Sequence, residues 1–304
     1  MTVEILARSE NLLGAQVRGV DLRKPVSPQD VAAITQAINR HAVIVFPGQF
    51  ITDEEQLVFS RQFGKLERRT SYARDKERIE HEEINDISNI DYENRLLTPG
   101  DRQRAMNDGN LLWHTDGTFK HIPSMLSMLH AREIPPEAGE TEFADMRAAY
   151  DALPQKMKDE LEDLIVEHSV YRSRSQVGFA NFNDEVFARL PPVQQVMIRL
   201  HPGSGRKSLC LASHADYVIG WPVEKGRKLL QDLIVQATQP QFVYSHRWSV
   251  GDLVIWDNRC TMHRARPYDD LKHRRVMHRT TVQDIANTVE LRYGKVPGLK
   301  SAQQ

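Results

Sequence analysis

Short runs of β-type residues, broken by glycine and proline, recur along most of the chain and constrain its fold more than any other feature. Many short strands at close spacing are typical of sandwiches and jelly rolls, in which antiparallel strands form two stacked sheets. The segments with this pattern are 41–48, 84–90, 111–119, 124–130, 208–212, 241–248, 252–256 and 274–282. Helical spacing of apolar residues predicts helices at 31–40, 52–63, 145–153, 154–167 and 223–237. We therefore predict a mainly β protein with flanking helices, arranged as a sandwich or jelly roll.

The 304 residues are predicted to form a single domain, 1–304, with two long inserted loops. The segment 65–110 is dense in arginine, aspartate and glutamate, and 172–195 has only weak patterning. Long charged insertions beside a site often act as lids, although solvated surface loops are more common. Both interpretations stay open for these two segments.

The charge balance gives no reason to propose nucleic acid or a membrane surface as a partner. There are 40 basic and 41 acidic residues, for a formal net charge of −1. The two cysteines, Cys210 and Cys260, make no disulfide framework and are expected to be reduced thiols. The N-terminal residues do not resemble a signal peptide, and no apolar run approaches the roughly 20 residues of a membrane span. We expect a cytoplasmic protein.

A histidine and a carboxylate, His114 and Asp116, lie two residues apart within the apolar run 111–119. Side chains two apart on a strand point to the same face, so the two would project together. With a third ligand they would form the two-histidine, one-carboxylate triad of non-haem Fe(II) sites, which leaves coordination positions open. The pair alone is weak evidence, because it recurs at His214 and Asp216 and could equally belong to a polar network.

The residues that follow each pair in the sequence distinguish the first pair from the second. Twenty-four residues lie between Asp116 and Thr141, a buried run at 252–256 leads towards His263, and eleven residues then separate His263 from Arg275. The second pair has Gln241 at the position that corresponds to the threonine. The order of histidine, aspartate, threonine, histidine and arginine therefore favours the first pair.

The strand predicted at 274–282 carries two arginines that are expected to point into the core. Arg275, Met277 and Arg279 share one face of it, so both arginines point inward if the methionine does. A buried arginine stays charged and needs an anion. Small anionic molecules could supply it, and so could a protein carboxylate such as Asp257 or Asp269. The same argument about faces favours Arg275 over its neighbour Arg274.

These motifs and three longer runs, 141–153, 203–207 and 246–263, resemble the Fe(II)/2-oxoglutarate-dependent dioxygenases of the taurine dioxygenase and 2,4-dichlorophenoxyacetate dioxygenase family. The likeness extends over nearly the whole chain and is closest to the 2,4-dichlorophenoxyacetate enzyme. It implies a double-stranded β-helix, that is, a jelly roll. It also implies that His114, Asp116 and His263 hold Fe(II), and that Thr141 and Arg275 bind the far carboxylate of 2-oxoglutarate.

The resemblance further implies how a substrate is held. Arg279 is similar to the family's anchor for the substrate's anionic group, and Asn110 lies where the family has a pocket residue. Tyr72 stands about where the aryloxyacetate enzyme has a lysine that contacts its substrate. The implied reaction uses O₂ and releases succinate and CO₂ as it hydroxylates a small organic acid. For an aryloxyalkanoate, hydroxylation next to the ether oxygen yields a phenol and glyoxylate.

Three other functions remain open from the sequence. An alkylsulfonate such as taurine would suit Arg279 equally well. A zinc-type hydrolase could use the same three metal ligands, but would leave Thr141 and the inward arginines unexplained. A jelly-roll binding protein would need no metal. Members of the family are often dimers or tetramers, so we expect a homo-oligomer.

Overall fold

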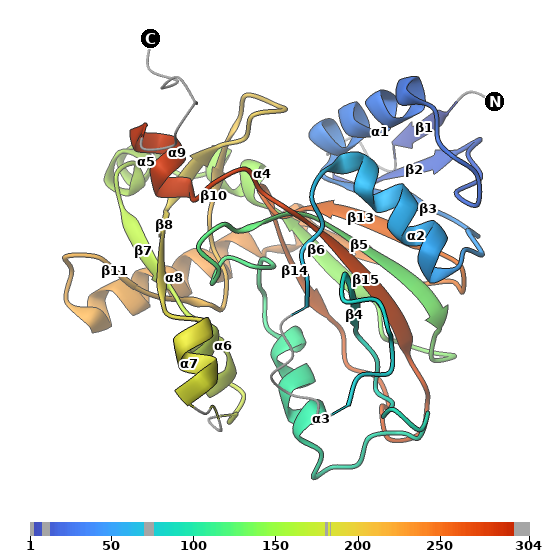
Figure 1. Ribbon diagram of the computed structural model, residues 1–304. Coiled ribbons are helices and arrows are strands. Elements are labelled where there is room, and N and C mark those ends of the chain that lie inside the picture. The colour runs from blue at the N-terminus through green and yellow to red at the C-terminus, as the bar shows by residue number, and fades with distance from the viewer. Residues whose placement is uncertain (1–2, 8–12, 70–75, 180–181, 183, 295–304) are drawn as a thin grey trace.

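The computed structural model describes residues 3–7, 13–69, 76–179, 182 and 184–294. Its largest sheet has seven strands in the order β1-β2-β3-β13-β5-β15-β4 (Figure 1). The strands are β1 (Glu4–Ala7), β2 (Ala15–Arg18), β3 (Val43–Phe46), β13 (Leu253–Asp257), β5 (Ser124–Glu133), β15 (Val276–Gln283) and β4 (Ile84–Asp86). All neighbours in this sheet are antiparallel except β2 and β3, which are parallel.

A second, three-stranded antiparallel sheet has the order β12-β6-β14. Its strands are β12 (Val243–His246), β6 (Thr141–Asp145) and β14 (Thr261–Ala265). An apolar cluster joins it to the large sheet: Phe143 of β6 packs on Trp256 of β13, with ring centroids 5.5 Å apart, and Met277 of β15 belongs to the same cluster. Two sheets that face each other across a shared core form the predicted jelly roll.

Two smaller sheets extend the fold beyond the jelly roll. One has the order β11-β7-β8 and the other pairs β10 with β9. Their strands are β7 (Ile165–His168), β8 (Val193–Val196), β9 (Ile198–Leu200), β10 (Lys207–Leu209) and β11 (Ala215–Val218).

Helices cover the sheets from outside. The two nearest the N-terminus, α1 (Pro28–His41) and α2 (Asp53–Ser60), bury Ile38 and Phe59 against strands β3, β5 and β13 of the large sheet. The others are α3 (Arg102–Asn107), α4 (Met146–Asp151), α5 (Gln155–Leu161), α6 (Val170–Ser175), α7 (Asp184–Arg189), α8 (Val223–Ala237), α9 (Thr288–Tyr293), η1 (Arg61–Phe63), η2 (Asp108–Leu111) and η3 (Pro240–Phe242). None of the helices in the described segments combines the length and the apolar character that a bilayer crossing needs.

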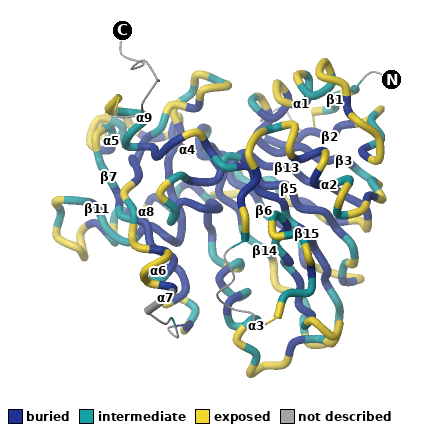
Figure 2. Tube along the Cα trace, viewed as in Figure 1, coloured by how far each residue is buried: buried dark blue, intermediate teal, exposed yellow. Residues whose placement is uncertain are grey.

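Buried residues run through the central strands, and exposed residues lie on the outer helices and turns (Figure 2). Both cysteines are buried and free, as the sequence predicts.

The prediction of a strand at 111–119 is wrong. Helix η2 ends at Leu111, His114 makes a single β-bridge, and a turn follows from Asp116. Gly117 has φ +67°, and a Cβ there would lie 2.1 Å from the Ser124 Oγ atom. The chain therefore turns after Asp116, at a position that favours glycine because side chains on L-residues disfavour positive φ.

Two further predictions between 154 and 195 need correction. The predicted helix 154–167 ends at Leu161, and its last residues form strand β7. The predicted loop 172–195 contains most of α6, all of α7 and the start of β8. Strand β7 forms because it lies between β8 and β11, and such pairing overrides local propensity.

The described residues of the charged segment, 65–69 and 76–110, form more than a solvated loop. They include β4, α3 and most of η2, and they contribute Leu66, Ile79 and Ile84 to the core beneath the large sheet. Its predicted strand, 84–90, is shortened to β4.

His168 on β7 is fully buried, and neither of its ring nitrogens has a hydrogen-bond partner among the described residues. Burial lowers its pKa from the ordinary 6.5 to about 3. Between these two values the unfolded chain binds a proton that the folded protein does not. Stability should therefore fall as the pH drops below 6.5, by about 2 kcal/mol at pH 5.

Replacing His168 with leucine should remove this penalty. Urea unfolding should show the stability of His168→Leu relative to wild type rising by about 2 kcal/mol between pH 8 and pH 5. A His121→Leu variant, changed at an exposed histidine, serves as the control. An equal difference at both pH values for His168→Leu would contradict the prediction.

Candidate active site

A two-residue β-bridge brings His114 and His263 together, although they are far apart in the sequence. The backbone N–H of His114 donates to the carbonyl of His263 at 3.0 Å, and the reverse bond is 2.8 Å. The imidazole centroids lie 4.1 Å apart. Asp116 completes the group: its carboxylate oxygens lie 3.9 Å from His114 Nε2 and 3.7 Å from His263 Nε2. One donor atom from each residue falls within 4.8 Å of the other two.

Both histidines are in the neutral state that metal binding requires. A carbonyl oxygen can only accept a hydrogen bond, so His114 Nδ1 donates its proton to the Leu112 carbonyl, at 2.8 Å. The other ring nitrogen, Nε2, then has a lone pair available for a metal. Burial lowers the pKa of His114, and it lowers that of His263 well below the ordinary value. Neutral imidazole is the form that binds metals.

Asp116 is buried but held in its charged form. Its Oδ1 accepts a hydrogen bond from Arg279 Nη1, and its Oδ2 accepts one from Ser127 Oγ, each at 2.7 Å. Burial raises the pKa of Asp116, but the net shift is downward, with the positive charge of Arg279 as the largest lowering effect and the hydrogen bond from Ser127 as a further one. The pairing of Arg279 with this carboxylate was not foreseen from the sequence.

Asn258 fixes the surroundings of Asp116. Its amide oxygen accepts from the backbone N–H of Asp116 at 3.2 Å and from the indole of Trp256 at 3.1 Å. Its amide nitrogen donates to Ser127 Oγ at 2.9 Å. Sequence reasoning missed both Asn258 and Ser127, because their roles depend on strands β13 and β5 being neighbours and no local motif marks them.

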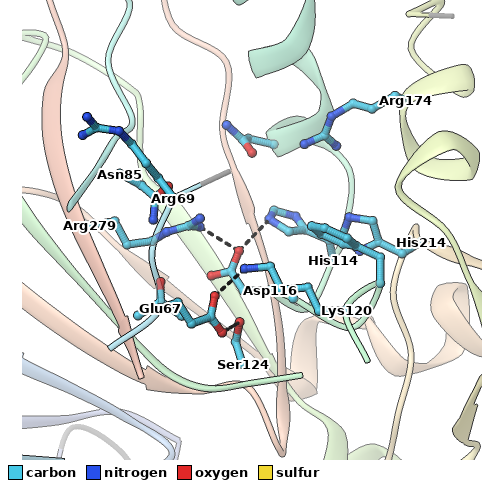
Figure 3. Close-up of a pocket in the computed structure, with 14 residues that line it drawn as sticks. Glu67, Arg69, Asn85, His114, Asp116, Lys120, Ser124, Arg174, His214 and Arg279 are labelled. Carbon is cyan, nitrogen blue, oxygen red and sulfur yellow. Dashed lines mark hydrogen bonds and ion pairs between the residues drawn. The ribbon is translucent and has the colours of Figure 1, made fainter. Parts of the chain in front are cut away.

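A cavity of about 90 Å³, here called the active-site cavity, opens beside the triad (Figure 3). The residues that line it are Glu67, Arg69, Asn85, Asn110, His114, Asp116, Gly117, Phe119, Lys120, Ser124, Arg174, His214, Arg279 and Thr281. Asn110 and Arg279 line the cavity, whereas His263, Thr141 and Arg275 do not. Tyr72 lies outside the described residues.

Arg275 and Arg274 point in opposite directions. Arg275 is 6% exposed, and its buried Nε has no hydrogen-bond partner among the described residues. Arg274 is exposed and pairs with Glu133 at 2.8 Å. The inward direction of Arg275 agrees with the argument from strand faces. Asp257, one possible partner, instead accepts hydrogen bonds from Arg259.

Thr141 begins β6, and its hydroxyl oxygen accepts a hydrogen bond from the Trp248 indole at 3.0 Å. Because that bond uses a lone pair of the oxygen, the hydroxyl proton remains available to an acceptor.

The side chains of the second histidine–aspartate pair, His214 and Asp216, have different surroundings. His214 lines the active-site cavity and packs on Phe119, with centroids 4.7 Å apart, whereas Asp216 pairs with Arg227 at 2.6 Å. Another histidine cluster is a hydrogen-bonded network: the two nitrogens of His201 contact Ser204 and Asp257.

Comparison with known proteins places the chain in a family. Residues 5–281 match the family described as taurine catabolism dioxygenase TauD, TfdA family. The chain is 41% identical over 274 residues to the alpha-ketoglutarate-dependent 2,4-dichlorophenoxyacetate dioxygenase of Cupriavidus pinatubonensis, covering 90% of this chain and 96% of that protein. It is 33% identical over 294 residues to the (S)-phenoxypropionate/alpha-ketoglutarate-dioxygenase of Sphingobium herbicidovorans, covering 94% and 97%.

The fold is likewise similar to that of AAD-2, solved in complex with Mn(II) and N-oxalylglycine. The TM-score is 0.87 at 44% identity, over 95% of this chain and 99% of that one. The chain belongs to the TauD/TfdA family of dioxygenases.

Proposed function

We propose that this protein is an Fe(II)- and 2-oxoglutarate-dependent dioxygenase that hydroxylates an aryloxyalkanoate such as 2,4-dichlorophenoxyacetate. The observation that carries the proposal is the convergence of His114, Asp116 and His263 within 4.8 Å, in a chain whose relatives are named for this reaction. When bound, iron and 2-oxoglutarate supply the oxidation of a substrate C–H bond by O₂, with succinate and CO₂ as coproducts.

The donor set supports Fe(II) as the metal at this site. Two neutral imidazoles and one carboxylate leave coordination positions open, and this combination suits non-haem iron. His263 Nδ1 has no hydrogen-bond partner among the described residues, and the ring is held by its backbone bridge and by packing 4.7 Å from Trp256. A zinc hydrolase would also use these ligands, but it gives no role to a buried arginine such as Arg275.

Arg275 and Thr141 are proposed to bind 2-oxoglutarate. A buried guanidinium with an unused N–H is stabilised by an anion, and a carboxylate can accept from it in bidentate geometry. The hydroxyl of Thr141, oriented by Trp248, can donate its proton to the same carboxylate.

Arg279 is proposed to bind the anionic group of the substrate, with Asn110 and Tyr72 as further contacts. Its buried Nε has no partner among the described residues, although Nη1 is held by Asp116. Hydroxylation of an aryloxyacetate at the carbon next to the ether oxygen gives a hemiacetal, which collapses to a phenol and glyoxylate. The names of these two relatives favour this substrate class over alkylsulfonates such as taurine.

We propose that the chain forms a single domain. We also propose that its segments 65–110 and 172–195 act as lids over the active site. The support is that Glu67, Asn85 and Asn110 from the first segment, and Arg174 from the second, line the active-site cavity. A lid would exclude water during the reaction. A cytoplasmic location and a homo-oligomeric state remain expectations, the latter to be tested by light scattering.

The function is tested by incubating the protein with Fe(II), 2-oxoglutarate, O₂ and a panel of aryloxyacetates, aryloxypropionates and alkylsulfonates. We expect phenol release matched by succinate, dependent on Fe(II). Succinate with sulfonates alone would favour the taurine-type alternative. Hydrolysis supported by zinc without succinate would favour the hydrolase.

Ser127 should govern metal affinity without touching the metal. Ser127→Ala removes the hydrogen bond that orients Asp116, and losing such support weakens metal binding about 10- to 100-fold. Calorimetric titration with Mn(II) in the presence of 2-oxoglutarate measures the change. Ser60→Ala, altering a buried serine on α2, is the matched control. Equal affinities in both variants would refute this role of Ser127.

The two inward arginines should have separable effects. Arg275→Gln should weaken 2-oxoglutarate binding, and Arg279→Gln should weaken binding of the aryloxy acid, each by about 10- to 100-fold through loss of a charged hydrogen bond. Steady-state KM values for both ligands test this. Arg274→Gln, which removes an exposed ion pair, should change neither. The reverse pattern would mean that the roles are exchanged.

A further inference from the structure

Among the described residues that line the active-site cavity, only two have a buried side-chain atom without a hydrogen-bond partner. These atoms are Nε of Arg279 and the hydroxyl oxygen Oγ1 of Thr281. Thr281 is only 2% exposed. A buried hydroxyl that makes no hydrogen bond is destabilising, so its presence at a cavity wall points to a ligand that supplies the missing acceptor.

Both residues lie on the same face of strand β15. They are two positions apart in the strand, so their side chains point to the same side. Thr280, which lies between them, points the other way, and its hydroxyl contacts Ser60 Oγ at 2.7 Å. Positions two apart on a strand are separated by about 7 Å. The two unpartnered atoms therefore face one region of the cavity, where a single small ligand can reach both.

Thr281 is held close to the metal ligands. It pairs with Ser127 of β5, and side chains directly opposite each other on antiparallel strands have Cβ atoms about 5 Å apart. The Ser127 hydroxyl is already used, because it donates to Asp116 and accepts from Asn258. The Thr281 carbonyl accepts from the Glu67 N–H at 2.8 Å, so its backbone is held on both sides. Its hydroxyl is thus fixed next to the residue that orients a metal ligand.

Two other cations that line the cavity already have partners. The ammonium of Lys120 contacts Glu67, whose carboxylate also accepts from Ser124 Oγ at 2.7 Å. Arg69 Nη1 donates to two backbone carbonyls, at 2.8 and 2.9 Å. An incoming acid would compete with these contacts, whereas the two atoms on β15 offer hydrogen bonds that no described residue accepts.

We propose that Thr281 binds the carboxylate of the aryloxyalkanoate together with Arg279. The Arg279 Nε–H donates to one carboxylate oxygen, and the Thr281 hydroxyl donates to the other. This inference rests on the proposed function and adds a second residue to its substrate subsite. An aryl ether oxygen is a weaker acceptor than a charged carboxylate, so the acid rather than the ether pairs with the hydroxyl. The proposed 2-oxoglutarate subsite combines an arginine with a threonine in the same way.

The test measures binding of phenoxyacetate and of 3-phenylpropionate, which keeps the acid but has a CH₂ group in place of the ether oxygen. Dissociation constants are obtained by calorimetry on the anaerobic protein with Mn(II) and 2-oxoglutarate. Thr281→Val removes the hydroxyl and keeps the branched shape, so it should weaken binding of both acids about 10-fold. Thr281→Ser should restore binding, and the affinity for 2-oxoglutarate should not change in either variant. Thr280→Val, on the opposite face of the strand, should leave all three affinities unchanged.

Thermal unfolding without ligands provides a measurement that a purely structural role would move in the opposite direction. Because the Thr281 hydroxyl has no partner among the described residues, replacing it with a methyl group should leave Tm unchanged or raise it. A lower Tm for Thr281→Val, or failure of this variant to fold, would show that the hydroxyl supports the fold and would overturn the inference.

The outcomes separate this inference from the proposed function. If wild type releases phenol from phenoxyacetate but Thr281→Val binds both acids as tightly as wild type, the role of Thr281 is overturned alone. A loss confined to phenoxyacetate would place the hydroxyl at the ether oxygen and would also overturn it. Wild type that neither binds the two acids nor releases phenol would overturn both proposals.

Discussion

The backbone bridge between His114 and His263 is the interaction on which the proposed chemistry depends. It fixes two imidazoles from distant segments at a ring separation of 4.1 Å, and the carboxylate oxygens of Asp116 lie 3.9 Å and 3.7 Å from their Nε2 atoms. His263 lies on strand β14, which pairs with β6. In this pairing His263 lies opposite Phe143, and Ala265 lies opposite Thr141. One small sheet therefore sets the position of Thr141 relative to His263.

The large sheet positions the two arginines that are proposed to bind anions. Arg279 lies on β15 opposite Leu129 of β5, and Arg275 immediately precedes that strand. Four residues of extended chain span about 13 Å, and Met277 lies between the two arginines in the core. In the proposed assignment, the two arginines would bind their acids at different places, because Arg279 lines the active-site cavity and Arg275 does not.

The direction of the two arginines could be predicted from the sequence, whereas much of the local structure around the site could not. Strand alternation put Arg275 and Arg279 on one inward face because a period of two is a local property, and Arg275 is buried while Arg279 lines the active-site cavity. The roles of Thr141 and the two arginines in binding ligands stay predictions. The turn at Gly117 was missed because the apolar residues around it imitate a strand. The hydrogen bonds of Ser127 were missed because they require β5 and β13 to be adjacent, which no short segment specifies. Strand β7 was read as helix for the same reason.

Arg279 connects the two halves of the site. Its Nη1 neutralises Asp116, while its buried Nε still lacks a partner among the described residues. In the proposed assignment, an anionic substrate bound at Nε shares one guanidinium with a metal ligand. The planar guanidinium has separate N–H groups, so it can donate hydrogen bonds to the substrate and to Asp116 at the same time. A lysine ammonium is a compact point charge and lacks this fixed arrangement of donors. A bound substrate would therefore change the strength of the ion pair between Arg279 and Asp116. The affinity of the site for metal would then depend on whether substrate is bound.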